Sequence, residues 1–127
     1  MARILVAEDE APLRAMVQRG LTQAGHEVVV AADGAEALAL LNRAGGKFDL
    51  LLADIRMPLM DGIALALTAA RDYPDLVILL MTGYADQRER AHGLDALIHD
   101  VIAKPFSLSE IQTAVAKALA APRGPKR

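Results

Sequence analysis

The stretch that decides the fold is Leu50-Leu51-Leu52-Ala53-Asp54-Ile55-Arg56-Met57-Pro58-Leu59-Met60-Asp61-Gly62. It begins with a wholly apolar run, and this run ends at the carboxylate of Asp54. A short apolar run bounded by turn residues is typical of a strand buried on both faces of a parallel sheet. Open parallel sheets bind their ligands just beyond the carboxyl ends of the strands. Asp54 lies at such an end, which makes it a candidate site residue. Taken alone, it is also compatible with an ordinary loop start.

Three other apolar runs end on residues that handle metal ions or phosphoryl groups. These residues are Glu8 and Asp9 after the run at 4–7, Thr82 after the run at 76–81, and Lys104 after the run at 101–103. If the runs are parallel strands of one sheet, the residues that follow them meet at one edge. The set therefore predicts a shared site around Asp54.

The spacing of the apolar runs predicts five strand-helix units. The runs begin near residues 4, 28, 50, 76 and 101, which leaves room for one strand and one helix in each interval. Parallel strands need helix-length connections, so we predict an α/β fold with helices on both faces of a parallel sheet. Five units suit the flavodoxin-like, doubly wound strand order 2-1-3-4-5, in which strands 1 and 3 are neighbours at the switch point.

Five helices are predicted to follow the strands, with termini marked by N-caps, a first-turn proline and terminal glycines. The fourth helix has the weakest signal, because Gly93 in its interior costs about 1 kcal/mol relative to alanine. The last opens with the capping box Ser107-Leu108-Ser109-Glu110. The predicted helices begin near Pro12, Gly34, Ile63, Asp86 and Ser107. We place the domain at residues 1–120 and a flexible basic tail at 121–127.

Composition narrows the class of protein. The chain has 127 residues, of which 54% are hydrophobic and 24% charged, as expected of one globular domain. The formal net charge of -2 provides no basic footprint for nucleic acid, and the lack of cysteine excludes disulfides and cysteine-ligated zinc. No apolar run reaches membrane-spanning length, and no signal peptide precedes the first strand. We expect a cytoplasmic protein that binds neither nucleic acid directly nor a membrane.

The carboxylates predicted at the switch point imply a divalent cation. Three carboxylates about 5 Å apart repel each other by roughly 3 kcal/mol per pair at an effective dielectric constant near 20, which a single lysine does not balance. Oxygen ligands without histidine or cysteine nearby favour Mg²⁺. With the cation in place, Asp54 becomes a carboxylate nucleophile for a phosphoryl group. The Thr82 hydroxyl and the Lys104 ammonium would then hold the phosphoryl oxygens.

Five short motifs surround the predicted site: Glu8-Asp9, Asp54 with Met57-Pro58, Asp61-Gly62, Thr82-Gly83 and Lys104-Pro105-Phe106. With them the chain resembles the receiver domain of two-component response regulators, the CheY-like family, from Arg3 to about Leu119. The resemblance implies that Asp54 accepts a phosphoryl group from a histidine kinase or histidine phosphotransferase. It implies that Asp9, Asp54 and the Arg56 backbone carbonyl ligate Mg²⁺ and that Glu8 acts mostly through water. It also implies a cis bond between Lys104 and Pro105.

The fifth strand departs from the family pattern. Receivers commonly carry an aromatic residue three positions before the lysine, and this residue swings inward when the threonine hydroxyl moves onto the phosphoryl group. Here the position is Val101. Tyr84, two residues after Thr82, either takes over this role or is a loop tyrosine with no part in switching. The resemblance thus implies a switch region that contains Tyr84, Val101 and Pro105.

A narrower resemblance concerns the stand-alone CpdR group of alphaproteobacterial regulators. The residues that carry it are Ile55-Arg56-Met57-Pro58, Thr82-Gly83-Tyr84 and Val101. Proteins of this group prime the ClpXP protease while they are unphosphorylated. The resemblance implies a protease adaptor whose output partner is ClpX. We therefore expect a single-domain response regulator that switches a protein contact and is not a multiple-turnover enzyme.

Two other functions remain open from the sequence. The chain could be a receiver cut from a longer DNA-binding regulator, with its basic tail as a linker. Haloacid-dehalogenase-like phosphatases also combine an aspartyl nucleophile with threonine or serine, lysine and Mg²⁺. Their nucleophile, however, lies near the N-terminus with a second aspartate two residues later, where this chain has Arg56. Separately, Met57, Leu59 and Met60 form either a docking patch or a cover over the edge of the core.

Overall fold

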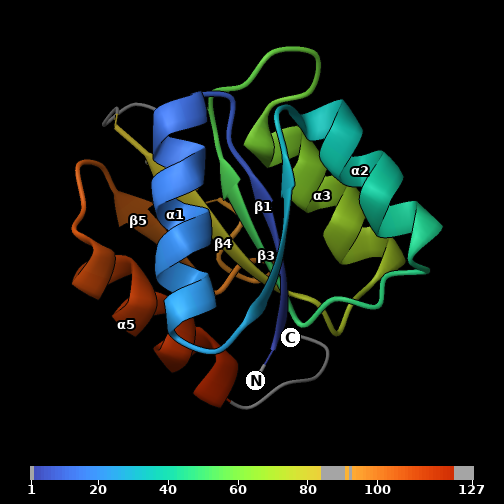
Figure 1. Ribbon diagram of the computed structural model, residues 1–127. Coiled ribbons are helices and arrows are strands. Elements are labelled where there is room, and N and C mark those ends of the chain that lie inside the picture. Colours follow the sequence, from blue (N-terminus) through green and yellow to red (C-terminus); the bar gives the residue numbers. More distant parts are fainter. Residues whose placement is uncertain (1, 84–90, 92, 122–127) are drawn as a thin grey trace.

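The protein is described here by a computed structural model that covers residues 2–83, 91 and 93–121. Five strands form one parallel sheet in the order β2-β1-β3-β4-β5, so the predicted strand order is confirmed (Figure 1). The strands are β1 (Arg3–Ala7), β2 (Glu27–Ala31), β3 (Leu50–Asp54), β4 (Val77–Thr82) and β5 (Asp100–Ala103). β1 and β3 are neighbours, as the predicted switch point requires.

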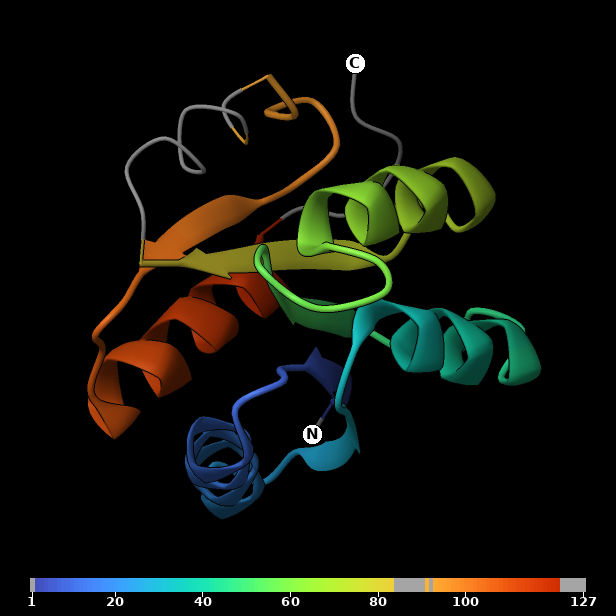
Figure 2. The ribbon, with the colours of Figure 1, turned by 90° about the horizontal axis from the view of Figure 1, so that it is seen from above.

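Helices cover both faces of the sheet (Figure 2). Two clusters of buried apolar side chains fill the space between the helices and the sheet. The helices are α1 (Ala11–Gln23) and α5 (Leu108–Ala120) on one face, and α2 (Gly34–Arg43) and α3 (Gly62–Asp72) on the other. Strand side chains alternate between the two clusters, as the two-residue period of a strand requires. β3 is buried along its whole length, because it lies between β1 and β4 and under both helix layers.

The prediction of a helix that runs through Gly93 needs correction. Most of the segment predicted to form the fourth helix, from Asp86 to His92, lies outside the described residues. Of its described residues, Ala91 is helical, whereas residues 93–97 form turns, with the Leu97 N–H donating to the Leu94 carbonyl at 2.7 Å. Placing Gly93 inside a helix was therefore wrong, and glycine is a weak helix former. The described part of the chain contains four α-helices.

Side-chain caps fix the starts of α3 and α5 at the carboxyl edge of the sheet. The predicted capping box is present: the Ser107 Oγ accepts from the Glu110 N–H at 3.0 Å, and the Glu110 Oε1 accepts from the Ser107 N–H at 2.8 Å. Asp61 caps α3 by accepting from the Ala64 N–H at 2.8 Å. Ser107 and Asp61 each end a loop that starts at a predicted site residue, so the caps anchor these loops. The tail predicted at 121–127 lies outside the described residues from 122 onward.

Gly20 lies in the middle of α1, at the contact with α5. A methyl group at this position would overlap Leu108 Cδ2, and the Gln112 Nε2 donates to the Gly20 carbonyl at 2.8 Å. The Leu108 side chain thus occupies the space that a side chain at position 20 would take. This explains why a residue with poor helix propensity is present in a buried helix interior.

We expect Gly20→Ala to lower the free energy of unfolding by about 1–3 kcal/mol, although alanine is the better helix former, because overpacking outweighs the gain in propensity. Urea denaturation measures the effect. In the same background, Leu108→Ala should restore part of the lost stability, since it removes the overlapping methyl groups. A Gly20→Ala variant more stable than the wild type would contradict this account of the α1–α5 contact.

Among residues 2–83, 91 and 93–121, none of the helices has both the length and the apolar character needed to cross a membrane.

Candidate functional site

Three carboxylates converge where β1 and β3 end. Glu8 follows β1 directly and is fully buried, and Asp54 is the last residue of β3 with 5% of its surface exposed. Asp9 is exposed beside them. Oxygen atoms of the three groups lie within 4.8 Å of one another. The predicted gathering of Glu8, Asp9 and Asp54 is therefore confirmed.

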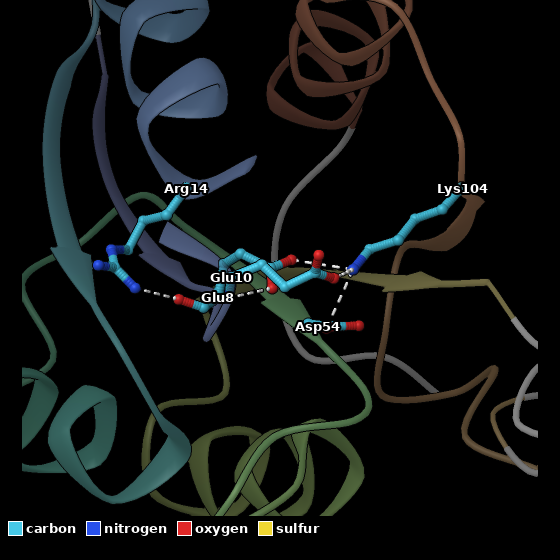
Figure 3. Close-up of polar contacts among 5 residues, drawn as sticks. All are labelled: Glu8, Glu10, Arg14, Asp54 and Lys104. Carbon is cyan, nitrogen blue, oxygen red and sulfur yellow. Dashed lines mark hydrogen bonds and ion pairs between the residues drawn. The ribbon is translucent and has the colours of Figure 1, made fainter. Parts of the chain in front are cut away.

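Lys104 brings the fourth charge to this cluster from the end of β5 (Figure 3). Its Nζ lies 3.0 Å from the Glu8 Oε1 and 3.0 Å from the Asp54 Oδ2, so one ammonium bridges two buried carboxylates. The Glu10 Oε1 is more distant, at 3.9 Å. Thr82, also predicted to belong to the site, is buried at the end of β4, the strand beside β3. Its place in the sheet agrees with the prediction.

Burial and charge shift the ionisation of the three bridged groups. Burial raises the pKa of Glu8 to about 7, although hydrogen bonds from the Glu10 N–H and from Lys104 act in the opposite direction. Burial also raises the pKa of Asp54, against the effect of the Lys104 hydrogen bond. For Lys104, burial alone would lower the pKa, but the hydrogen bonds and charges of Glu8 and Asp54 outweigh burial and raise it. The raised pKa of Lys104 therefore keeps the ammonium protonated, and the raised pKa values of Glu8 and Asp54 make these two carboxylates easier to protonate than they would be in water.

The segment between β3 and α3 folds back onto the end of β3. The Ile55 N–H donates to the Met81 carbonyl at 3.0 Å, and the Gly62 N–H donates to the Ile55 carbonyl at 2.8 Å. A methyl group at Gly62 would overlap the Asp54 carbonyl oxygen. Only glycine allows this approach, which explains the Asp61-Gly62 motif. The backbone on both sides of the Asp54 side chain is thereby fixed.

Arg14 and Glu10 are polar neighbours of the cluster that the sequence analysis missed. The Arg14 Nη1 donates to the Glu8 backbone carbonyl at 2.8 Å, and the Glu10 N–H donates to the Glu8 Oε2 at 3.0 Å (Figure 3). Together these contacts fix the turn between β1 and α1, which carries the acidic pair. The available signal was the position of Arg14 in the first turn of a helix that begins next to Glu8.

An open cleft of about 860 Å³ has Asp54 and Lys104 among its lining residues. Its apolar walls come from the start of α1 and from the segment between β5 and α5: Pro12, Leu13, Met16, Pro105 and Phe106. A cleft lined by apolar side chains together with a few charged groups is typical of binding sites.

The loop residues proposed as a docking patch have different environments. Met57 is buried, and Met60 packs against the core cluster on the α2–α3 face. Only Leu59 is exposed, with 84% of its surface accessible. The alternative interpretation, a cover over the edge of the core, is right for the two methionines and wrong for Leu59.

The donor atoms of the cluster fit Mg²⁺. Three carboxylates lie within reach of one ion, and the group contains neither histidine nor cysteine. Hard oxygen donors of this kind suit Mg²⁺, which binds to one or two carboxylates, keeps several waters and takes up phosphoryl oxygens.

Comparison with known proteins agrees with this arrangement. Residues 4–116 match the family described as the response regulator receiver domain. The chain belongs to this family. The receiver domain is similar to the transcriptional regulatory protein TcrA of Mycobacterium tuberculosis, with 37% identity over 109 residues. This match covers 86% of the chain but 42% of TcrA, so the chain spans less than half the length of this curated relative.

Solved receiver structures have the same fold. The chemotaxis response regulator CheY4 of Vibrio cholerae is 30% identical, with a TM-score of 0.83 and coverage of 93% of this chain and 98% of that one. The response regulator TrrA of Thermotoga maritima, solved in complex with Mg²⁺ and BeF, also has 30% identity and a TM-score of 0.83, covering 93% and 99%. The flavodoxin-like fold and the CheY-like resemblance are confirmed.

The region expected to switch the receiver domain is described only in part. Val101 is half-buried and packs against the core on the α2–α3 face. The Lys104-Pro105 peptide bond is cis, as the resemblance implied. Tyr84 lies outside the described residues, so its proposed role stays a prediction.

Proposed function

We propose that this receiver domain accepts a phosphoryl group on Asp54 with the help of Mg²⁺ and thereby switches a contact with another protein. The observation that carries the proposal is the Asp54 carboxylate, held 3.0 Å from Lys104 Nζ beside Glu8 and Asp9. A carboxylate with a fixed cationic partner at the mouth of a cleft is placed to act as a nucleophile. The structure of TrrA in complex with Mg²⁺ and BeF supports the choice of cation.

Each residue of the site has a separate task in this proposal. Asp54 attacks phosphorus and forms the new oxygen-phosphorus bond. Lys104, already bound to Asp54, pairs with the phosphoryl oxygens, and the Thr82 hydroxyl donates to another of these oxygens. Asp9, Asp54 and the Arg56 carbonyl would hold Mg²⁺, with Glu8 acting through water. The bound cation supplies the charge that draws an anionic donor to a cluster of carboxylates.

The donor is proposed to be a histidine kinase or a histidine phosphotransferase. The apolar walls of the cleft, with Pro12 and Met16 on one side and Phe106 on the other, suit the apolar face of a donor helix. Such a helix would bring its phosphohistidine to the open end of the cleft, where Asp54 lies. The phosphorus-nitrogen bond then breaks as the bond to Asp54 forms, and the imidazole leaves with the electron pair.

The output is proposed to be a protein contact rather than sustained catalysis. If the chain acts alone, the narrower resemblance to the CpdR group suggests ClpX as partner, and a pull-down of ClpX with phosphorylated and unphosphorylated protein tests this. Equal capture of ClpX by both forms would reject the adaptor role. The match covers only 42% of TcrA, which favours the alternative that the domain is one part of a longer regulator. In that case the output is made by the rest of that protein.

Labelling tests the proposed function directly. With Mg²⁺ and a small donor such as phosphoramidate, the protein should gain one phosphoryl group, detected by intact mass and lost at high pH as an acyl phosphate is. It should not turn over phosphate monoesters repeatedly, which distinguishes it from the phosphatase alternative. Absence of labelling at saturating Mg²⁺, or steady release of phosphate from a monoester, would overturn the proposal.

The affinity for Mg²⁺ should increase with pH across neutrality. The pKa of Glu8 is raised to about 7, so below this pH a proton competes with the cation for the cluster. One displaced proton corresponds to at most about a tenfold change in affinity per pH unit. Calorimetric titrations one unit below and one unit above this pKa measure the slope. Glu8→Gln should flatten it, and an unchanged slope in that variant would assign the proton to another group.

A further inference from the structure

Leu59 is in a backbone conformation that leucine rarely adopts. Its φ is +69°, and among the described residues it is the single non-glycine residue with a positive φ. The Met60 N–H donates to the Pro58 carbonyl at 2.8 Å, which closes a three-residue γ-turn around Leu59. γ-Turns with a positive φ at the centre are rare and strained, and a bulky side chain adds to the strain.

The surrounding structure imposes this turn. On one side, a methyl group at Gly34 would overlap the Met60 carbonyl oxygen, so the start of α2 packs directly against the loop. On the other side, Gly62 contacts the backbone of Asp54. The burial of Met57 holds the loop from a third direction. The path of the chain through residue 59 is therefore fixed, whatever side chain that residue carries.

Leucine is unfavourable at this position for two independent reasons. Glycine or asparagine would adopt the positive φ with less strain. The leucine side chain also gains almost no burial within the domain, because 84% of its surface is exposed. Residues that violate local preferences without a compensating contact in the fold are expected at functional positions. The missing contact is then one that Leu59 makes with another molecule.

We infer that Leu59 is an apolar anchor for the protein that donates the phosphoryl group, an inference that rests on the proposed function of Asp54. The segment 55–61 projects beyond the ends of the strands, at the edge of the sheet where Asp54 lies (Figure 1). Any protein that brings a phosphohistidine to Asp54 must cover this edge. The apolar pocket that receives Leu59 therefore lies on the donor, beside its phosphohistidine.

The cleft and Leu59 would hold the donor from two directions. The walls of the cleft belong to α1 and to the segment before α5, on one face of the sheet. The loop that carries Leu59 leads to α3, on the opposite face. A donor seated on both would have its histidine fixed above Asp54, between them. Contacts on two sides of the reacting group restrict orientation better than a contact on one side.

Leu59 variants should accept the phosphoryl group more slowly from a protein donor but at an unchanged rate from a small donor. The probe is the ³²P-loaded histidine kinase or phosphotransferase of the source organism that transfers fastest to the wild-type protein. With this donor, Leu59→Gly and Leu59→Asn should reduce kcat/KM roughly 10- to 100-fold, the range expected for one lost leucine contact. With phosphoramidate and Mg²⁺, both variants should be labelled at the wild-type rate. Neither should unfold at a lower temperature than the wild type, because both relieve strain.

Two controls distinguish a docking role from a structural one. Leu59→Met keeps an apolar side chain on the same backbone and should retain most of the transfer rate. Leu67→Ala removes another exposed leucine, on α3, and should have no effect. Equal transfer from the protein donor to Leu59→Gly and wild type, or failure of every such donor to phosphorylate the wild type, would overturn the anchor. Loss of labelling by phosphoramidate in the wild type would instead overturn the proposed function.

Discussion

Asp54→Asn is expected to abolish phosphoryl labelling altogether, the largest single effect that the site predicts. The amide has nearly the shape of the carboxylate and its oxygen can still accept a hydrogen bond from Lys104, but it is not a nucleophile. The fold should survive, because burial raises the pKa of Asp54 and a neutral group at this position relieves that penalty. Intact mass after incubation with phosphoramidate and Mg²⁺ measures the loss.

Asp33→Asn is the matched control for this substitution. Asp33 caps α2 by accepting from the Glu36 N–H at 2.8 Å, and asparagine caps helices equally well. This variant should be labelled like the wild type, which shows that the exchange of an aspartate for asparagine is not itself harmful. Labelling of Asp54→Asn at the wild-type level would place the phosphoryl group on another residue.

Lys104→Met is expected to have the largest effect on stability in the absence of metal. It leaves Glu8 and Asp54 buried without the cation that bridges them at 3.0 Å. Removing one partner of a buried ion pair typically costs 3–5 kcal/mol, and we expect roughly 3 kcal/mol because Lys104 is partly exposed. Urea denaturation above neutral pH, with a chelator present, measures this loss.

The stability lost in Lys104→Met should be larger at high pH than at low pH. The pKa of Glu8 is raised from 4.5 to about 7, so the stability that Glu8 contributes is present below its ordinary value and is lost as the pH rises through about 7. Near the lower end of this window Glu8 is protonated and no longer needs a cationic partner, so Lys104→Met should then be less harmful. Lys117→Met, on the outer surface of α5, should change little at either pH. A loss for Lys104→Met that is equal at both ends of the window would contradict the ion-pair explanation.

The features predictable from the sequence are those determined by local chemistry or by the order of apolar runs. The run 50–53 ending on Asp54 indicated a buried central strand, and the spacing of the other runs indicated the neighbours of this strand. The capping box at Ser107 was predictable because its two hydrogen bonds join residues three positions apart. Once β1 and β3 are adjacent, the position of each acidic residue directly after its strand is enough to bring the carboxylates together.

The features that could not be predicted depend on packing between distant parts of the chain. Nothing in the sequence around Leu59 signals a positive φ, because the turn is imposed by Gly34 and Gly62 from outside it. The contact between Gly20 and Leu108 joins helices at opposite ends of the chain. Gly93 is a different case: the local cap signal at Asp86 favoured a helix through Gly93, but residues 93–97 form turns.

The complete burial of β3 has a consequence for how fast different parts of this domain exchange their amide hydrogens with solvent. The backbone amides of a central strand, bonded to neighbours on both sides, exchange their hydrogens with solvent only when the whole domain opens. Asp54 ends this strand, whereas the turn at Leu59, only five residues further along, is on the surface. Deuterium should therefore reach the amide of the exposed Leu59 in a brief labelling pulse and reach β3 only over the lifetime of the folded state. The residue proposed to carry the chemical signal should thus belong to the slowest-opening part of the molecule, five residues from an amide that exchanges quickly.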